Sequence, residues 1–221
     1  MISKQLTEIY DLLFDRFGPQ HWWPGQTQFE IITGAILTQN TNWTNVEKAI
    51  TNLKSADRLT PEKLHYLDVS QLAELIRPAG YYNIKAKRLK NFIDWLFENY
   101  EGQLTNLETV DTEQLRAELL AIKGVGRETA DSILLYAFER PIFVVDAYTA
   151  RIAFRHRLIE PDAGYEQLRK LFQSNVPQDV QLFNEYHALL VRAGKEFCKP
   201  KAKCPGCPLE ELPHSLDTEY F

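Results

Sequence analysis

Three cysteines near the end of the 221-residue chain form its densest group of side chains able to do chemistry. Cys198 is followed by Cys204 and Cys207, with five and then two residues between them, and no other cysteine occurs. Thiolates at this density are typical metal ligands, of zinc or of an iron–sulfur cluster. A disulfide framework is implausible with so few cysteines in so short a stretch. The sequence therefore predicts a ligand loop over residues 198–214.

Asp146 follows a short apolar run and lies at the expected start of a helix. Residues 142–145 are all apolar, and apolar residues at helical spacing follow Asp146. Aspartate is a favoured N-cap residue and stabilises a helix there by about 1 kcal/mol. Position alone thus predicts a helix cap at Asp146.

Residues 119–138 predict two helices joined by a tight glycine turn, a helix-hairpin-helix. Glycines let the backbone approach a phosphate closely, and the N–H groups at the next helix start favour an anion. Such a hairpin grips a DNA backbone without reading its sequence. An ordinary corner between two helices would show the same pattern. The candidate backbone contacts are Lys123, Gly124, Val125, Gly126 and Arg127.

The elements that position these residues are helices along almost the whole chain. Apolar residues recur at helical spacing, and glycines and prolines separate the runs, which predicts an all-α protein of about ten or eleven helices. We expect two helical lobes with a central cleft. Residues 26–134, including the hairpin, form one lobe, a six-helix barrel. Residues 1–25 plus 135–197 form the second helical lobe, and residues 198–214 form the cysteine loop.

The composition limits the partners. With 44% hydrophobic residues the chain can bury a core, and no apolar run is long enough to span a membrane. We expect a cytoplasmic monomer, associated with the nucleoid in a prokaryote. A net charge of -5 requires any DNA site to be local. Basic residues do cluster, at Lys85, Lys87, Arg88 and Lys90, at Arg151, Arg155 and Arg157, and at Lys195, Lys199, Lys201 and Lys203.

Four segments together resemble the endonuclease III, or helix-hairpin-helix-GPD, superfamily of DNA glycosylases. They are LTQNTNWTNVEKAI, the hairpin, VVDAYTARIAFR and CKPKAKCPGCPL. The resemblance implies the endonuclease III-like fold, double-stranded DNA with a damaged base as substrate, and a catalytic role for Asp146. In that role the carboxylate stabilises an oxocarbenium-like sugar.

The family's iron–sulfur loop uses four cysteines, and this chain has Pro213 where the fourth would fall. Three interpretations remain. A [4Fe–4S] cluster takes His214 or an outside group as its fourth ligand, a zinc ion is held by the three cysteines and His214, or the loop holds no metal.

Bifunctional members of the family carry a lysine on the second hairpin helix, where this chain has Glu128. A carboxylate cannot form the imine that precedes strand cleavage. We therefore expect a glycosylase without lyase activity, with Glu128 as a residue suited to the first turn of a helix.

The aromatic residues resemble one branch, the 3-methyladenine DNA glycosylases of the endonuclease III type. The segments HWWPG and TQNTNW carry the likeness. It implies that Trp22 and Trp43 sandwich the flipped alkylated purine, with Trp23 and Pro24 beside them. A cationic base between aromatic rings gains stacking of about 1 to 3 kcal/mol and a cation–π contribution of roughly 0.5 to 2. The alternative is that Trp22 and Trp23 only pack as hydrophobic side chains against the N-terminal helix.

A flipped base leaves a gap that a wedge side chain fills. Gln39 and Asn40 are the candidates, and capping of the helix near Asn42 is the alternative. We thus expect excision of alkylated purines such as 3-methyladenine. The rivals are a glycosylase for oxidised pyrimidines or mismatches, and a non-catalytic helix-hairpin-helix DNA-binding protein.

Overall fold

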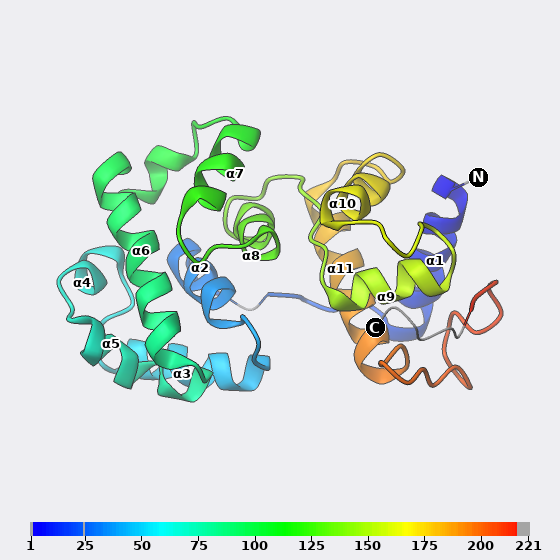
Figure 1. The fold of residues 1–221 in the computed structure, drawn as a ribbon, viewed down its shortest axis with the longest axis horizontal. Helices are drawn as coiled ribbons and strands as arrows, with labels where there is room; N and C mark the ends of the chain where they lie inside the picture. Colours follow the sequence, from blue (N-terminus) through cyan, green and yellow to red (C-terminus); the bar gives the residue numbers. More distant parts are fainter. Residues whose placement is uncertain (1, 24, 216–221) are drawn as a thin grey trace. The chain divides into compact units, whose positions relative to one another are not determined.

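The structure, a computed structural model, describes residues 2–23 and 25–215. These residues form helices and no strand, so the predicted all-α class is confirmed. The chain divides into two compact units, one of Met1–Trp22 with Pro141–Phe221 and one of Trp23–Arg140 (Figure 1). The division falls a few residues from the expected lobe limits. Residues 135–140 stay with the unit that begins at Trp23 because Tyr136 stacks on the Trp23 ring.

The unit Trp23–Arg140 is a bundle of short helices. Its elements are α2 (Gln28–Leu37), α3 (Trp43–Ser55), α4 (Pro61–His65), α5 (Val69–Leu75), η1 (Arg77–Ala79), α6 (Tyr82–Tyr100), η2 (Leu104–Leu107), α7 (Thr112–Ala121), α8 (Arg127–Ser132) and the π-helical turn η3 (Ile133–Ala137).

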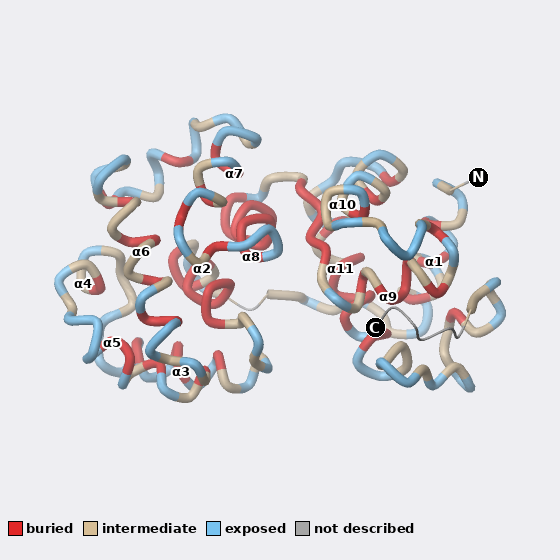
Figure 2. The backbone as a smooth tube through the Cα atoms, in the orientation of Figure 1, coloured by how far each residue is buried: buried red, intermediate tan, exposed pale blue. Residues whose placement is uncertain are grey.

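Helix α2 forms the centre of this unit. Nearly every residue of α2 is buried, as Figure 2 shows, and it contacts α3, α6, α8 and η3. A mostly apolar helix that is buried on nearly every side belongs in a core. Its N-cap Thr27 accepts a hydrogen bond from the Glu30 N–H at 3.2 Å. The cap fixes the start of α2, and burial of Ile36 and Leu37 holds its last turn in the core.

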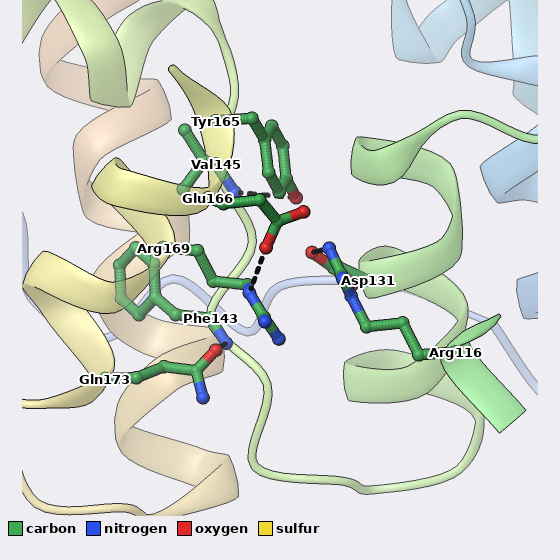
Figure 3. A network of polar contacts seen from close by, with 8 residues as sticks. All are labelled: Arg116, Asp131, Phe143, Val145, Tyr165, Glu166, Arg169 and Gln173. Atoms are coloured by element: carbon green, nitrogen blue, oxygen red, sulfur yellow. Dashed lines mark hydrogen bonds and ion pairs between the residues drawn. The ribbon is translucent and has the colours of Figure 1, made fainter. Parts of the chain in front are cut away.

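The two helices of the hairpin are joined by a buried ion pair (Figure 3). Arg116 on α7 donates from Nε to Oδ1 of Asp131 at 2.6 Å and from Nη2 to Oδ2 at 3.1 Å. Removing one partner of such a pair leaves an uncompensated buried charge, at a cost of about 3–5 kcal/mol. The pair therefore fixes α7 against α8 on either side of the glycine turn.

The other unit consists of α1 (Ile2–Phe17), α9 (Ala147–Arg155), α10 (Tyr165–Gln173) and α11 (Val180–Glu196). Helix α11 packs against both α9 and α1. Phe143 stacks on Phe172 with ring centroids 4.3 Å apart, and the Tyr186 hydroxyl donates to the Leu6 carbonyl at 2.8 Å. These contacts build an aromatic core behind the segment that precedes α9.

That segment, residues 142–145, has no regular secondary structure and is held by side chains of α10 (Figure 3). The Phe143 N–H donates to Gln173 at 3.2 Å, and the Val145 N–H donates to the Tyr165 hydroxyl at 3.4 Å. Its end at Asp146 is therefore fixed. Among the described residues no helix is long and apolar enough to cross a membrane.

Candidate functional site

Asp146 is the N-cap of α9, as the sequence predicted. Its backbone is extended, and Oδ1 accepts from the Thr149 N–H at 2.7 Å and from the Thr149 hydroxyl at 2.9 Å. The other oxygen, Oδ2, lies 3.7 Å from His187 Nε2. The carboxylate side chain is only 10% exposed. It is thus oriented by three groups in an almost completely buried position.

The pKa of Asp146 lies below its usual value. Burial acts to raise it, but the contacts with His187 and the two hydrogen bonds from Thr149 outweigh burial and lower it. Each of these groups favours the charged form of a carboxylate. Asp146 therefore stays ionised at neutral pH and can stabilise a positive charge that develops beside it.

His187, which sequence reasoning missed, lies on α11 and is 5% exposed. The Trp22 ring meets it edge-on with centroids 6.4 Å apart. The Lys195 amine lies 5.7 Å from the centre of the Trp22 ring. Trp22 thus belongs to the same group of side chains as Asp146. The sequence around His187 did not indicate its contact with Asp146, because the two residues are far apart in the chain.

The unit Trp23–Arg140 contains its own aromatic group. The Trp23 ring stacks on Tyr136 at 4.6 Å with an interplanar angle of 11°, and it meets Trp43 edge-on at 5.1 Å. A Cβ on Gly34 would lie 3.3 Å from Trp43, so the bare α2 backbone forms a wall beside these rings. The sequence analysis expected Trp22 and Trp43 to form one pocket with Trp23 beside them. Trp23 and Trp43 are in contact within this unit, whereas Trp22 belongs to the other unit, where it meets His187. Tyr136 was missed. Pro24 lies outside the described residues.

The hairpin turn has the backbone that its glycines predict. Gly124 has a φ of 101°, and a Cβ there would overlap the Arg88 side chain. Gly126 is the N-cap of α8 and offers no side-chain hydrogen bond to the first N–H groups. Lys123, Arg127 and Glu128 are exposed around the turn, and Val125 is buried beneath it. The structure thus presents basic side chains and backbone N–H groups together.

The two predicted wedge residues differ in their surroundings. Gln39 Nε2 donates to the Gly124 carbonyl at 3.0 Å and to the Thr129 hydroxyl at 2.9 Å, and its Oε1 accepts from Arg88. Gln39 therefore ties the α2–α3 turn to the hairpin. Asn40 is exposed with a φ of 53°. The cap of α3 is Asn42, which accepts from the Asn45 N–H at 3.0 Å.

An exposed aromatic residue, Tyr81, was also missed by the sequence reasoning. It directly precedes α6, is 69% exposed and has a φ of 46°. A bulky residue in the left-handed region is uncommon and indicates a constrained turn. Tyr81 is notable because it is exposed, and the helical spacing of apolar residues in the sequence does not indicate which aromatic residues are exposed.

The cysteine loop brings its expected donors to one cavity. Cys198, Cys204, Cys207 and His214 all line a space of about 20 Å³. His156, which was not among the expected donors, lines it as well, and its Nδ1 atom is buried there without a hydrogen-bond partner among the described residues.

The donors do not form a ready ligand set. Within residues 2–23 and 25–215 no three His, Cys, Asp or Glu side chains lie close enough to hold a metal ion. Pro213 occupies the fourth-cysteine position. The residues present therefore do not fit a cluster held by four cysteines.

Buried Arg155 instead organises the loop. Its Nη1 donates to Cys198 Sγ at 3.1 Å and to the Lys199 carbonyl at 2.7 Å, and its Nη2 donates to the Pro200 carbonyl at 2.7 Å. The Ser215 N–H donates back to the Arg155 carbonyl at 2.7 Å. These bonds hold both ends of the loop on α9. They do not depend on a metal.

Comparison with known proteins finds one family across this site. Residues 33–178 match the HhH-GPD superfamily of base excision DNA repair proteins. A Methanocaldococcus jannaschii protein, provisionally named a DNA repair glycosylase, is 51% identical over 95% of this chain and 96% of its own length. Endonuclease III of Thermotoga maritima is 32% identical over 82% of this chain and 80% of its own.

Solved structures show the same architecture. The 3-methyladenine DNA glycosylase of Helicobacter pylori, bound to 1,N6-ethenoadenine, is similar with a TM-score of 0.74 and 31% identity, over 88% of this chain and 97% of that one. An endonuclease III–DNA complex has a TM-score of 0.81 at 24% identity, over 96% and 94% of the two chains. The predicted endonuclease III-like fold is thus confirmed.

Proposed function

Because the chain belongs to the HhH-GPD superfamily of base excision DNA repair proteins, we propose that it is a monofunctional glycosylase for alkylated purines such as 3-methyladenine. The observation that carries this proposal is Asp146, buried and ionised at the start of α9, with His187 and Trp22 beside it. The likeness to the Helicobacter pylori 3-methyladenine DNA glycosylase supports the choice of base.

The chemistry needs only one carboxylate. An N-alkylated purine is cationic and leaves as a neutral molecule, so its departure requires no general acid. Positive charge then develops on the sugar, and a fixed carboxylate stabilises it without reorganisation. Asp146 is held for this task by Thr149 and His187. As the base leaves, an adjacent water attacks C1′ of the sugar and passes its proton to the Asp146 carboxylate. The aromatic rings of Trp22 and Trp43 serve to bind the cationic base.

Strand cleavage is not part of the proposed activity. The family's lyase members need an amine on the second hairpin helix, and Glu128 occupies that position in the first turn of α8. A carboxylate there interacts favourably with the helix dipole. Lys123, before the turn, is proposed to contact phosphate.

Damaged double-stranded DNA is the proposed substrate. The hairpin turn Gly124–Gly126 offers backbone N–H groups to a phosphate, and exposed Lys123 and Arg127 add positive charge. Asn40 and Tyr81 are the exposed side chains proposed to meet the duplex at the damaged position. The bonds of Arg155 to residues 198–200 are proposed to fold the cysteine loop without a cluster.

The substitution Asp146→Asn tests the catalytic assignment. Asparagine is an equally good N-cap, so α9 is expected to remain capped while the charge is lost. We expect excision of 3-methyladenine to fall by about 10²–10³-fold, with binding to an abasic-site duplex retained.

The matched control is Asp179→Asn, because Asp179 caps α11 by accepting from the Leu182 N–H at 2.7 Å. It should excise normally. Unchanged excision by Asp146→Asn would make Asp146 a cap alone and would favour a non-catalytic DNA-binding protein.

A further inference from the structure

One lysine of the basic group on α6 is not on the surface. Lys85 is 1% exposed. Its Nζ atom donates to the Leu37 carbonyl at 2.8 Å and to the Ala79 carbonyl at 2.7 Å. Leu37 is the last residue of α2, and Ala79 is the last residue of η1. A single ammonium group therefore joins the ends of two helices that are far apart in the sequence.

The physical basis for this contact lies in the helix ends. The last carbonyls of a helix have no partner within it and carry partial negative charge. A buried ammonium group is costly unless such groups satisfy it. Because both oxygens lie within hydrogen-bond distance of one nitrogen, their separation is fixed by Lys85.

Each of the two helix ends leads into a turn with an exposed side chain. Asn40 follows α2 with a φ of 53°, and Tyr81 follows η1 with a φ of 46°. Left-handed backbone is disfavoured for a residue with a Cβ, more for Tyr81 than for Asn40, whose short polar side chain tolerates it. Such residues persist only where the surroundings fix them. Lys85 supplies one of those constraints to both turns.

One turn further along α6, Arg88 connects the α2–α3 turn to the hairpin. Arg88 donates to Gln39, and Gln39 donates to the Gly124 carbonyl. Gly124 packs against the Arg88 side chain so closely that a Cβ would overlap it. Lys85 and Arg88 thus connect three turns of one unit. These turns are residues 38–42, 80–81 and 122–126.

We propose that Lys85 is a positioning residue that fixes Asn40 and Tyr81 relative to each other, so that both side chains contact damaged DNA as one surface. The proposal rests on the proposed function, since it takes these turns as the ones that meet the duplex. Lys85 itself does not touch DNA or the reacting sugar. Its effect is on recognition of the damaged position.

The test is a comparison of duplex binding by variants. The probes are an abasic-site duplex and the matched undamaged duplex, and 2-aminopurine beside the abasic position reports unstacking. The variants are Asn40→Ala, Tyr81→Ala, their double variant, and each of these in the Lys85→Met background. Thermal unfolding sets a temperature at which every variant is folded. Lys87→Met is the matched control, because it removes a charge from the exposed face of the same helix.

We expect Lys85→Met to lose roughly fivefold or more of the preference for the abasic-site duplex and to reduce the 2-aminopurine signal. Lys85→Arg should recover part of both, whereas Lys87→Met should keep the preference ratio. The effects of Asn40→Ala and Tyr81→Ala should be non-additive with Lys85 present and additive in the Lys85→Met background.

Additive effects of Asn40→Ala and Tyr81→Ala in the otherwise unchanged chain would overturn the proposal, even if Lys85→Met does not fold. Normal preference and unstacking by folded Lys85→Met would overturn it as well. Failure of the proposed function is distinct from both, since the unchanged protein would then release no 3-methyladenine, whatever its preference for the abasic-site duplex.

Discussion

Asp146 and His187 face each other with 3.7 Å between the carboxylate Oδ2 and the imidazole Nε2, from the start of α9 and the middle of α11. Both side chains are almost completely buried. Together with Thr149, His187 offsets the effect of burial on the pKa of Asp146 and lowers that pKa. The pair explains how a carboxylate remains charged in an almost completely buried position.

The substitution His187→Leu should raise the pKa of Asp146. It removes the imidazole that favours the charged carboxylate and leaves burial, which disfavours the charged form. The acidic limb of the excision rate should therefore move to higher pH. A single-turnover pH profile measures this, with His65→Leu in the other unit as control. An acidic limb that stays in place would show that His187 does not act on Asp146.

The same pair contributes to stability in a defined pH range. The native pKa of Asp146 is depressed, so its contribution is present above the unfolded-state pKa and is lost as pH falls through the native value.

Trp43 is expected to act through base binding. Trp43→Ala should reduce single-turnover excision of 3-methyladenine by about tenfold or more, because base–aromatic stacking is worth about 1–3 kcal/mol. Binding to an abasic-site duplex should persist, since that duplex carries no base to stack. Trp95→Ala is the control, as Trp95 packs on Phe92 and Tyr100 away from this group. Equal losses in the two variants would assign Trp43 to the core.

The cysteine loop gives a prediction for metal content. We expect protein purified without oxygen to lack stoichiometric iron and sulfide, and chelators to leave its unfolding temperature unchanged. Arg155→Met should lower that temperature because the buried bonds to residues 198–200 are lost. A cluster spectrum would contradict this account. Zinc without iron would instead indicate the mononuclear site expected from the sequence, with the three cysteines and His214 as ligands.

The features predicted correctly from sequence are those with local signals. Helical periodicity gave the all-α fold, and Gly124 and Gly126 marked the hairpin. An apolar run before Asp146 indicated a cap, and Asp146 does cap α9. Each of these depends on residues a few positions apart, for which local physical chemistry is decisive.

The missed features depend on contacts between distant segments. His187 contacts Asp146 from another helix. Tyr136 stacks on Trp23, although the two residues lie near opposite ends of the sequence of their unit. Lys85 was grouped with surface lysines, yet it is buried because two carbonyls satisfy it. Arg155 was likewise taken as part of a basic cluster and is buried on the cysteine loop. Charge and periodicity do not reveal such partners.

Single-turnover excision by the unchanged protein is the most direct test of the proposed activity. The substrates are duplexes carrying 3-methyladenine, thymine glycol or a T·G mismatch, each analysed with and without alkali. We predict release of 3-methyladenine, with strand breaks only after alkali. Breaks without alkali would contradict the interpretation of Glu128, and activity on the other two lesions alone would contradict the assignment of Trp22 and Trp43 to an alkylated purine.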